Sequence, residues 1–177
     1  MPDARPDDSP EAVVCYAESP DGIAWTKPNL GLFTVRHTRE NNVILTNAPF
    51  SHNFSPLLDA RPGVPEGERY KALAGDHKRG LHAFKSADGI HWTRPNLGLF
   101  EFEGSKDNNI LWDGEGAHDF SPFIDTNPAC KPDQKYKAVT CAVNFVPGEK
   151  DDRKTLAAYV SADGIQWKLL RKEPIIT

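Results

Sequence analysis

Short apolar runs separated by polar, glycine- and proline-containing turns follow one another along most of the chain. Each run has about the length of a strand, is rich in aromatic and aliphatic residues, and is too short for a stable helix. A first set of four runs lies at residues 54–59, 69–75, 80–86 and 93–102. A second set lies at residues 120–125, 135–143, 154–161 and 166–170. The pattern predicts an all-β chain in which a unit of four strands repeats.

A long internal repeat supports this organisation. Residues 19–33 read SPDGIAWTKPNLGLF and residues 86–100 read SADGIHWTRPNLGLF, which are identical at twelve of fifteen positions. A third copy begins at residue 161 as SADGIQW. The starts of the copies lie 67 and then 75 residues apart, and the extra length falls in the polar segment 144–154. We expect that segment to be a longer surface loop.

Further landmarks recur in the same order. His52 and His118 begin the related stretches HNFSPLLD and HDFSPFID, and in both copies a tyrosine follows 18 residues after the histidine. A pair of asparagines begins 16 residues after the tryptophan in both copies. Four short strands repeated in this way are typical of the blades of a β-propeller. The period exceeds the roughly 40–50 residues of propellers with short loops, so longer loops are expected here.

The repeated motif S-x-D-G-x-x-W is interpreted as a turn. It lies between the third and fourth runs, where glycine can adopt a positive φ without a steric penalty. The aspartate and serine side chains can accept hydrogen bonds from backbone N–H groups of the turn. The tryptophan, Trp25, Trp92 or Trp167, is expected to fold back over the hairpin. A catalytic role for these aspartates is the weaker alternative, because they recur once in each unit at a tight turn.

Composition restricts the classes of function. The chain has 177 residues with 21 Lys+Arg and 25 Asp+Glu, a formal net charge of −4. Without a basic stripe, nucleic acid and anionic membrane are not expected partners, and no apolar run approaches the roughly 18 residues of a membrane span. Cys15, Cys130 and Cys141 lack metal-ligand spacing. We expect no metal and no cofactor.

The N-terminal segment 1–11 is acidic and rich in proline. It has neither a basic n-region nor an apolar h-region, so it is predicted to be a disordered leader and not a secretion signal. A cytoplasmic location is therefore expected.

The motifs together resemble known carbohydrate-active proteins. S-x-D-G-x-x-W resembles the Asp box of sialidases, with one residue fewer between Asp and Gly. The longer string SADGIHWTRPNLGLFEFEGSKDNNI, followed by HDFSPFIDTNP and KYKAV, resembles bacterial proteins related to glycoside hydrolase families 32 and 43. The resemblance covers residues 12–177 and implies a five-bladed β-propeller that acts on plant or microbial glycans.

The chain is too short for a whole propeller of that kind. Residues 12–49 match the outer half of one blade, 50–115 a second blade and 116–177 a third. Closed propellers have roughly four to eight blades, and five at this period would need on the order of 350 residues. We therefore expect a partial five-bladed propeller of about two and a half blades. Further chain, further copies or another subunit would complete it, because unclosed blades expose apolar faces and strand edges.

The resemblance implies three carboxylates at the mouth of a central channel: a base or nucleophile, a residue that modulates the transition state or a pKa, and a general acid. Glycoside hydrolysis needs two carboxylates that flank the scissile bond, with their roles separated by their pKa values. The residues just before the first run of each blade are His52 and Asn53, and then His118 and Asp119. Asp119 is the preferred catalytic candidate, because neutral Asn53 stands at the equivalent place. The alternative is that Asp119 caps a turn.

Other candidates surround this pair. His52, Asn53 and His118 are candidates for binding sugar hydroxyls, and the two histidines alone are a weak signal for a metal. Trp112 lies six residues before His118 and could stack on a sugar ring or pack in the core. Asp59 and Asp125 are interpreted as turn formers. The general acid is left open between Glu115 and Glu173.

Two classes of function follow. The first is a glycosidase-like propeller segment that binds and hydrolyses glycosidic linkages once its ring is complete. The second is a non-catalytic segment that binds carbohydrate or another protein.

Overall fold

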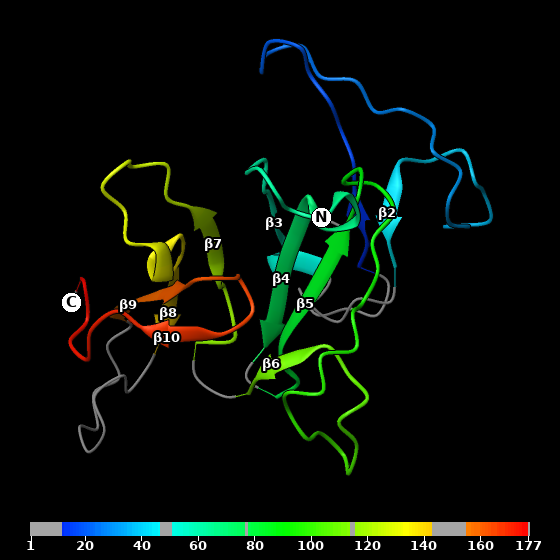
Figure 1. Cartoon of the computed structure of the whole chain (residues 1–177). Coiled ribbons are helices and arrows are strands. Elements are labelled where there is room, and N and C mark those ends of the chain that lie inside the picture. Colours follow the sequence, from blue (N-terminus) through cyan, green and yellow to red (C-terminus); the bar gives the residue numbers. More distant parts are fainter. Residues whose placement is uncertain (1–11, 47–50, 77, 114–115, 143–154, 177) are drawn as a thin grey trace.

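The computed structural model describes residues 12–46, 51–76, 78–113, 116–142 and 155–176, without the side chains of His52 and Ala142. Three antiparallel sheets make up this part of the chain (Figure 1). The first consists of β1 (Val14–Cys15) and β2 (Val43–Leu45). The second consists of β3 (Ser55–Leu58), β4 (Tyr70–Asp76), β5 (Gly80–Ser86) and β6 (Ile110–Trp112). The third consists of β7 (Ser121–Ile124), β8 (Tyr136–Ala142), β9 (Thr155–Ser161) and β10 (Trp167–Leu169).

The predicted all-β class is confirmed. In both four-stranded sheets each strand pairs with the next one along the chain. The only other regular elements among the described residues are three single turns of 3-10 helix, η1 (Ser51–Asn53), η2 (Glu66–Glu68) and η3 (Pro132–Gln134). No helix in the described ranges is long and apolar enough to cross a membrane. The predicted leader 1–11 and the predicted loop 144–154 lie outside the described residues.

The fourth strand of the second sheet lies later in the chain than predicted. Residues 93–102 were expected to form it, but the structure places β6 at Ile110–Trp112. Segment 93–102 contains Pro95, which has no backbone donor for a ladder, and Gly98 with a φ of 64°. The segment instead forms a loop, in which Thr93 makes an isolated bridge to Lys85 of β5 and Phe102 makes one to Ser105 within the loop itself.

The first sheet repeats the outer half of the second in register. β5 pairs with β6 through Leu81↔Trp112 and His82↔Ile110, with an irregularity between the two pairs. β1 pairs with β2 through Val14↔Leu45 and Cys15↔Val43, with an irregularity at the same place. Residues separated by 67 positions therefore occupy equivalent sites in the two sheets.

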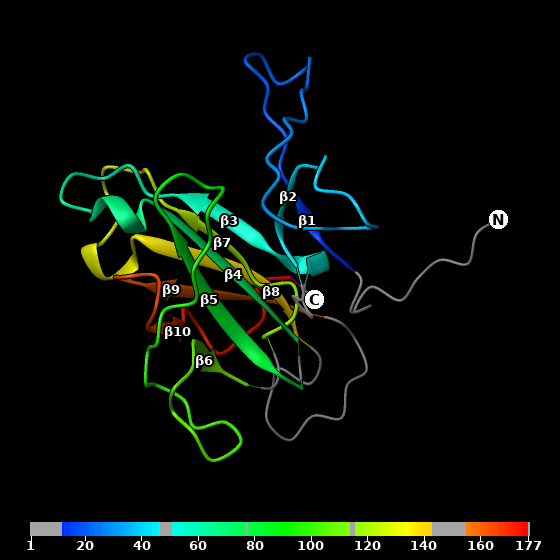
Figure 2. The same cartoon turned by 90° about the vertical axis from the view of Figure 1, so that its right-hand side faces the viewer.

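The second sheet lies between the other two, and Figure 2 shows the strands of the third sheet behind it. One face packs against the first sheet through the cluster Leu45, Ala72, Ala74 and Phe84. The other packs against the third sheet through Leu73, Leu81, Ala83, Ala117, Phe120 and Ala138. This stacking agrees with neighbouring blades, whereas the ring of five blades stays a prediction.

A buried polar cluster also joins the second and third sheets. Asp59, whose side chain is fully buried, accepts two hydrogen bonds of 2.9 Å from the guanidinium of Arg61. It also accepts a hydrogen bond from the hydroxyl of Tyr136, at the start of β8. The Lys71 ammonium lies 3.4 Å from the same carboxylate. Asp59 therefore shapes a local turn, as expected, and in addition links two sheets.

Candidate functional site

The predicted site residues lie at one end of the second and third sheets. Because β3 and β4 are antiparallel, the start of β3 adjoins the end of β4. The same relation holds for β7 and β8. The segment before β7 crosses the end of β4, since a Cβ placed on Gly75 would lie 2.6 Å from the carbonyl oxygen of Ala117. The starts of β3 and β7 therefore share this end with the β4–β5 hairpin.

Asn53 has a structural role at this end. Its side chain is buried, its amide nitrogen donates to the carbonyl oxygen of Gly75, and its Oδ1 accepts from the Gly75 N–H at 3.2 Å. Both ends of the amide are therefore used to fix the start of β3 against the end of β4. The amide is thus engaged within the chain, and a contact between Asn53 and a ligand stays a prediction.

Asp119 lies at the equivalent place in the third sheet but is arranged differently. Its side chain is 56% exposed, and its Oδ2 lies 2.9 Å from Nδ1 of His118, whose side chain is 33% exposed. Its φ of 55° lies in the left-handed region, which is uncommon for residues other than glycine, although aspartate tolerates it better than most. The result is a solvent-facing carboxylate beside an imidazole.

His118 is fixed through its backbone. The hydroxyl of Thr140 in β8 lies 2.8 Å from the carbonyl oxygen of His118 and 3.1 Å from that of Gly116. The strand that follows Asp119 is anchored by Phe120, which is buried between the sheets. The carboxylate is therefore presented on a backbone that is held on both sides.

The other two predicted ligand-binding residues have different outcomes. His52 lies in η1, and its side chain is outside the described part of the structure, so its role stays a prediction. Trp112 stacks on Tyr159 with ring centroids 5.6 Å apart and meets the edge of Phe120 at 5.1 Å. It therefore packs among aromatic residues between the sheets. It also lines, with Leu99, an open cleft of about 460 Å³ between the outer strands.

The three S-x-D-G-x-x-W segments form the expected turn. In the second copy, Asp88 Oδ1 accepts from the N–H groups of Ile90 and His91 at 2.8 Å each, and the indole of Trp92 donates to the carbonyl oxygen of Gly89. The same bonds occur around Asp21 and Asp163. Burial raises the pKa of the Asp88 carboxyl, but these donors lower it more, so the net shift is downward.

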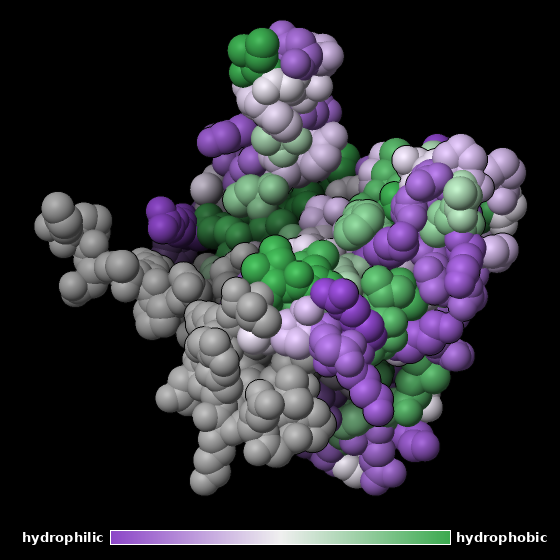
Figure 3. Space-filling model, turned by 90° about the vertical axis from the view of Figure 1, so that its left-hand side faces the viewer, coloured by the Kyte–Doolittle hydropathy of each residue, from purple (hydrophilic) through white to green (hydrophobic). Residues whose placement is uncertain are grey.

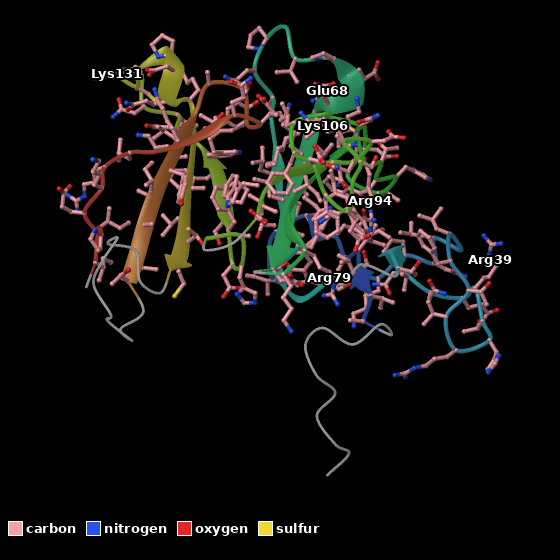
Figure 4. All side chains as sticks on the ribbon, turned by 90° about the horizontal axis from the view of Figure 1, so that it is seen from below. Arg39, Glu68, Arg79, Arg94, Lys106 and Lys131 are labelled. Atoms are coloured by element: carbon pink, nitrogen blue, oxygen red, sulfur yellow. The ribbon has the colours of Figure 1, made fainter. Side chains whose placement is uncertain are left out.

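Sequence reasoning missed a cavity on the outer part of the second sheet. It has a volume of about 450 Å³, and Arg79, His82, Arg94 and Asp107 are among the residues that line it. The guanidinium of Arg79 is paired with Asp76 at 2.8 Å. Burial lowers the pKa of His82, whose ring nitrogens lie 2.9 Å from the carbonyl oxygen of Arg79 and 3.0 Å from Oδ1 of Asn109. Figure 4 shows Arg79 and Glu68 at opposite ends of β4.

No group of metal-ligating side chains forms within the described ranges. Cys15, Cys130 and Cys141 are free thiols. A scan against protein-family models found no match. Searches of curated proteins and of solved structures also found none.

Proposed function

We propose that this chain is part of a β-propeller that binds carbohydrate and hydrolyses a glycosidic linkage at the end of the sheets where β3 and β7 begin. Asp119 is one active-site carboxylate in this proposal, and His118 orients it. The main support for this proposal is a difference between two equivalent positions. The Asn53 side chain is buried and forms hydrogen bonds with Gly75 through both ends of its amide, whereas Asp119 is exposed and paired with His118.

The contacts of Asp119 argue against a turn cap. Asp88, which does cap a turn, accepts from two backbone N–H groups. Among the described residues, none of the hydrogen bonds to backbone N–H groups involves the Asp119 carboxylate, which is instead paired with the His118 ring. Left-handed backbone at a residue other than glycine is also concentrated at functional sites, where it aims a side chain.

A carboxylate beside a histidine suits general acid–base chemistry. Asp119 can act as the base for an attacking water or as a charge that stabilises an oxocarbenium-like transition state. The second carboxylate stays open between two residues. Glu115 lies outside the described residues. Glu173 is exposed. The residues that follow it, Ile175 and Ile176, form backbone hydrogen bonds with Leu156 of β9. Leu156 in turn pairs with Cys141 near the end of β8.

A non-catalytic interaction role is the second candidate, and the outer face of the third sheet favours it. Phe123 on this face is 46% exposed. Leu73 and Leu81 in the second sheet are buried against the third, but their counterparts Val139 and Leu156 are only partly buried. Figure 3 shows hydrophobic patches between hydrophilic ones on the side of the molecule where this sheet lies.

The two candidates are separated by Asp119→Asn. The full chain is screened for binding to a glycan array and for release of reducing sugar from the glycans it binds. We expect Asp119→Asn to lower turnover by about 10²-fold or more while binding persists, because removal of a general base has effects of that size. Asp133→Asn is the matched control, since Asp133 is exposed and paired with Lys168 beyond the other end of the sheet.

A chain that binds no glycan overturns the proposal. Binding and turnover that Asp119→Asn leaves unchanged overturn the role of Asp119. A variant that melts at a lower temperature yet retains full turnover identifies Asp119 as a turn residue.

A further inference from the structure

Among the residues that the structure describes, the first sheet has two strands where its repeat has four. β5 pairs with β4 on one edge along all seven of its residues and with β6 on the other. β1 occupies the position of β5 in its own sheet, but among the described residues it pairs only with β2. As far as the described residues go, the edge of β1 that corresponds to the β4 side of β5 is therefore open for further strand pairing.

The S-x-D-G-x-x-W turn at residues 19–25 also has fewer described contacts than the corresponding turns of the other two sheets. Trp92 meets the edge of Phe54 with ring centroids 5.0 Å apart and an angle of 89°. Trp167 meets Phe120 at the same distance and an angle of 81°. In each case the phenylalanine directly precedes the first strand of the same sheet. Trp25 has no such partner within the described ranges and is 60% exposed.

The glycine of the turn gives a second, independent comparison. A Cβ placed on Gly89 or on Gly164 would lie 3.1 Å from the ring of Tyr70 or Tyr136, each of which begins the second strand of its sheet. A Cβ placed on Gly22 would meet nothing within 4 Å. Within the described part of the chain, the first turn therefore has neither the phenylalanine nor the tyrosine that cover the other two.

The second sheet shows where the absent strands would lie. Tyr136 is 1% exposed, and its hydroxyl donates to Asp59, which directly follows the first strand of the preceding sheet. Tyr70 is its counterpart one repeat earlier but is less buried. The carboxylate equivalent to Asp59 would belong to the inner strands that the first sheet lacks.

We infer that the open edge of β1 binds a β-hairpin of the kind formed by β3 and β4, carried by a polypeptide segment outside these 177 residues. Its signature is F-S-P-x-x-D followed by Y-K. The phenylalanine packs on Trp25, the tyrosine covers Gly22, and the aspartate accepts the hydroxyl of Tyr70. A second copy of this chain does not supply it, because β3–β4 and β7–β8 are already paired with β5 and β9.

The inference depends on the repeat and the strand pairing, and it holds whether or not the chain binds carbohydrate. The probe is a peptide with the sequence of residues 51–76, added to the full chain or fused ahead of it through a flexible linker. We expect the fusion to raise the melting temperature by several degrees. We also expect a blue shift of tryptophan emission that is absent in the Trp25→Phe chain.

A matched peptide with Phe54→Ala, Asp59→Ala and Tyr70→Ala has lost all three predicted contacts and should produce neither effect. Because a fusion could misfold, amide exchange of residues 14–18 with the free peptide provides a second measurement. Equal effects of the two peptides, or no protection of these amides, overturn the inference. Burial of Trp25 by concentration-dependent dimerisation without peptide also overturns it, since a second copy would then be the occupant.

Discussion

At the scale of single residues, the contacts that the sequence predicts well are local ones. The turn bonds of Asp88 reach only two and three residues along the chain, so spacing alone indicates them. Asp59 and Asn53 were harder to interpret, because their partners come from distant strands. Tyr136 lies 77 residues from Asp59, and Gly75 lies 22 residues from Asn53. Nothing in the local sequence distinguishes such a partner from an ordinary turn.

The buried carboxylate of Asp59 leads to a prediction for stability. Asp59→Asn should lower the free energy of unfolding by about 1.5–3 kcal/mol, because it weakens the hydrogen bonds that Arg61 donates to a fully buried carboxylate. Urea unfolding measures the change. Asp125→Asn is the control: Asp125 pairs with Lys137 at 2.5 Å but both side chains are partly exposed. That pair should contribute only about 0–1 kcal/mol, so equal losses would contradict the prediction.

The same residue predicts a pH dependence. Burial raises the pKa of Asp59, but hydrogen bonds from Arg61 and Tyr136 lower it more, and the folded pKa lies below the ordinary 3.8. A lowered folded pKa gives a contribution to stability that is present above the unfolded pKa and is lost as pH falls through the folded one. Wild-type stability should therefore fall more steeply below about pH 4 than that of Asp59→Asn. Parallel curves would show that Asp59 is not the titrating group.

At the scale of elements, the strand runs were predicted from apolar pattern and turn residues, and one was misplaced. Segment 93–102 is apolar enough to suggest a strand, but it forms a loop that precedes β6 in the chain. The side chain that organises this loop is Asn108. Its amide nitrogen donates to the carbonyl oxygens of Phe100 at 2.9 Å and Ser105 at 3.0 Å, and its Oδ1 accepts from the N–H of Ile110.

Asn108→Asp tests whether this side chain holds the loop. The aspartate retains an acceptor for Ile110 but cannot donate to the two carbonyl oxygens, so we expect a loss of about 1–3 kcal/mol in the free energy of unfolding. Asn127→Asp is the control, because its described side-chain bond is one accepted from the N–H of Ala129. The prediction is wrong if both variants unfold at the same urea concentration as the wild type.

At the scale of the whole molecule, the repeat predicted four-stranded units and their order, and the all-β class is confirmed. It also predicted that His118 and Asp119 lie at the start of a strand. It could not predict that Asn53 would be buried while Asp119 is exposed, since both follow a histidine and precede F-S-P. The cavity near Arg79 and Arg94 was missed because its lining comes from two separate segments of the chain.

The stacking of the sheets predicts where the molecule is most resistant to local opening. β4 and β5 are paired on both edges and lie in a sheet with both faces covered, whereas β1 has two residues and, in the part of the chain that is described, one paired edge. Amide exchange should therefore be slowest at residues such as Leu73 and Ala83. It should be intermediate in β8 and β9, whose outer face is partly exposed, and fastest in β1 and β2. Hydrogen–deuterium exchange at several urea concentrations measures this order. Equal protection of β1 and β5 would mean that the first sheet does not open before the second, and that the open edge of β1 does not weaken it.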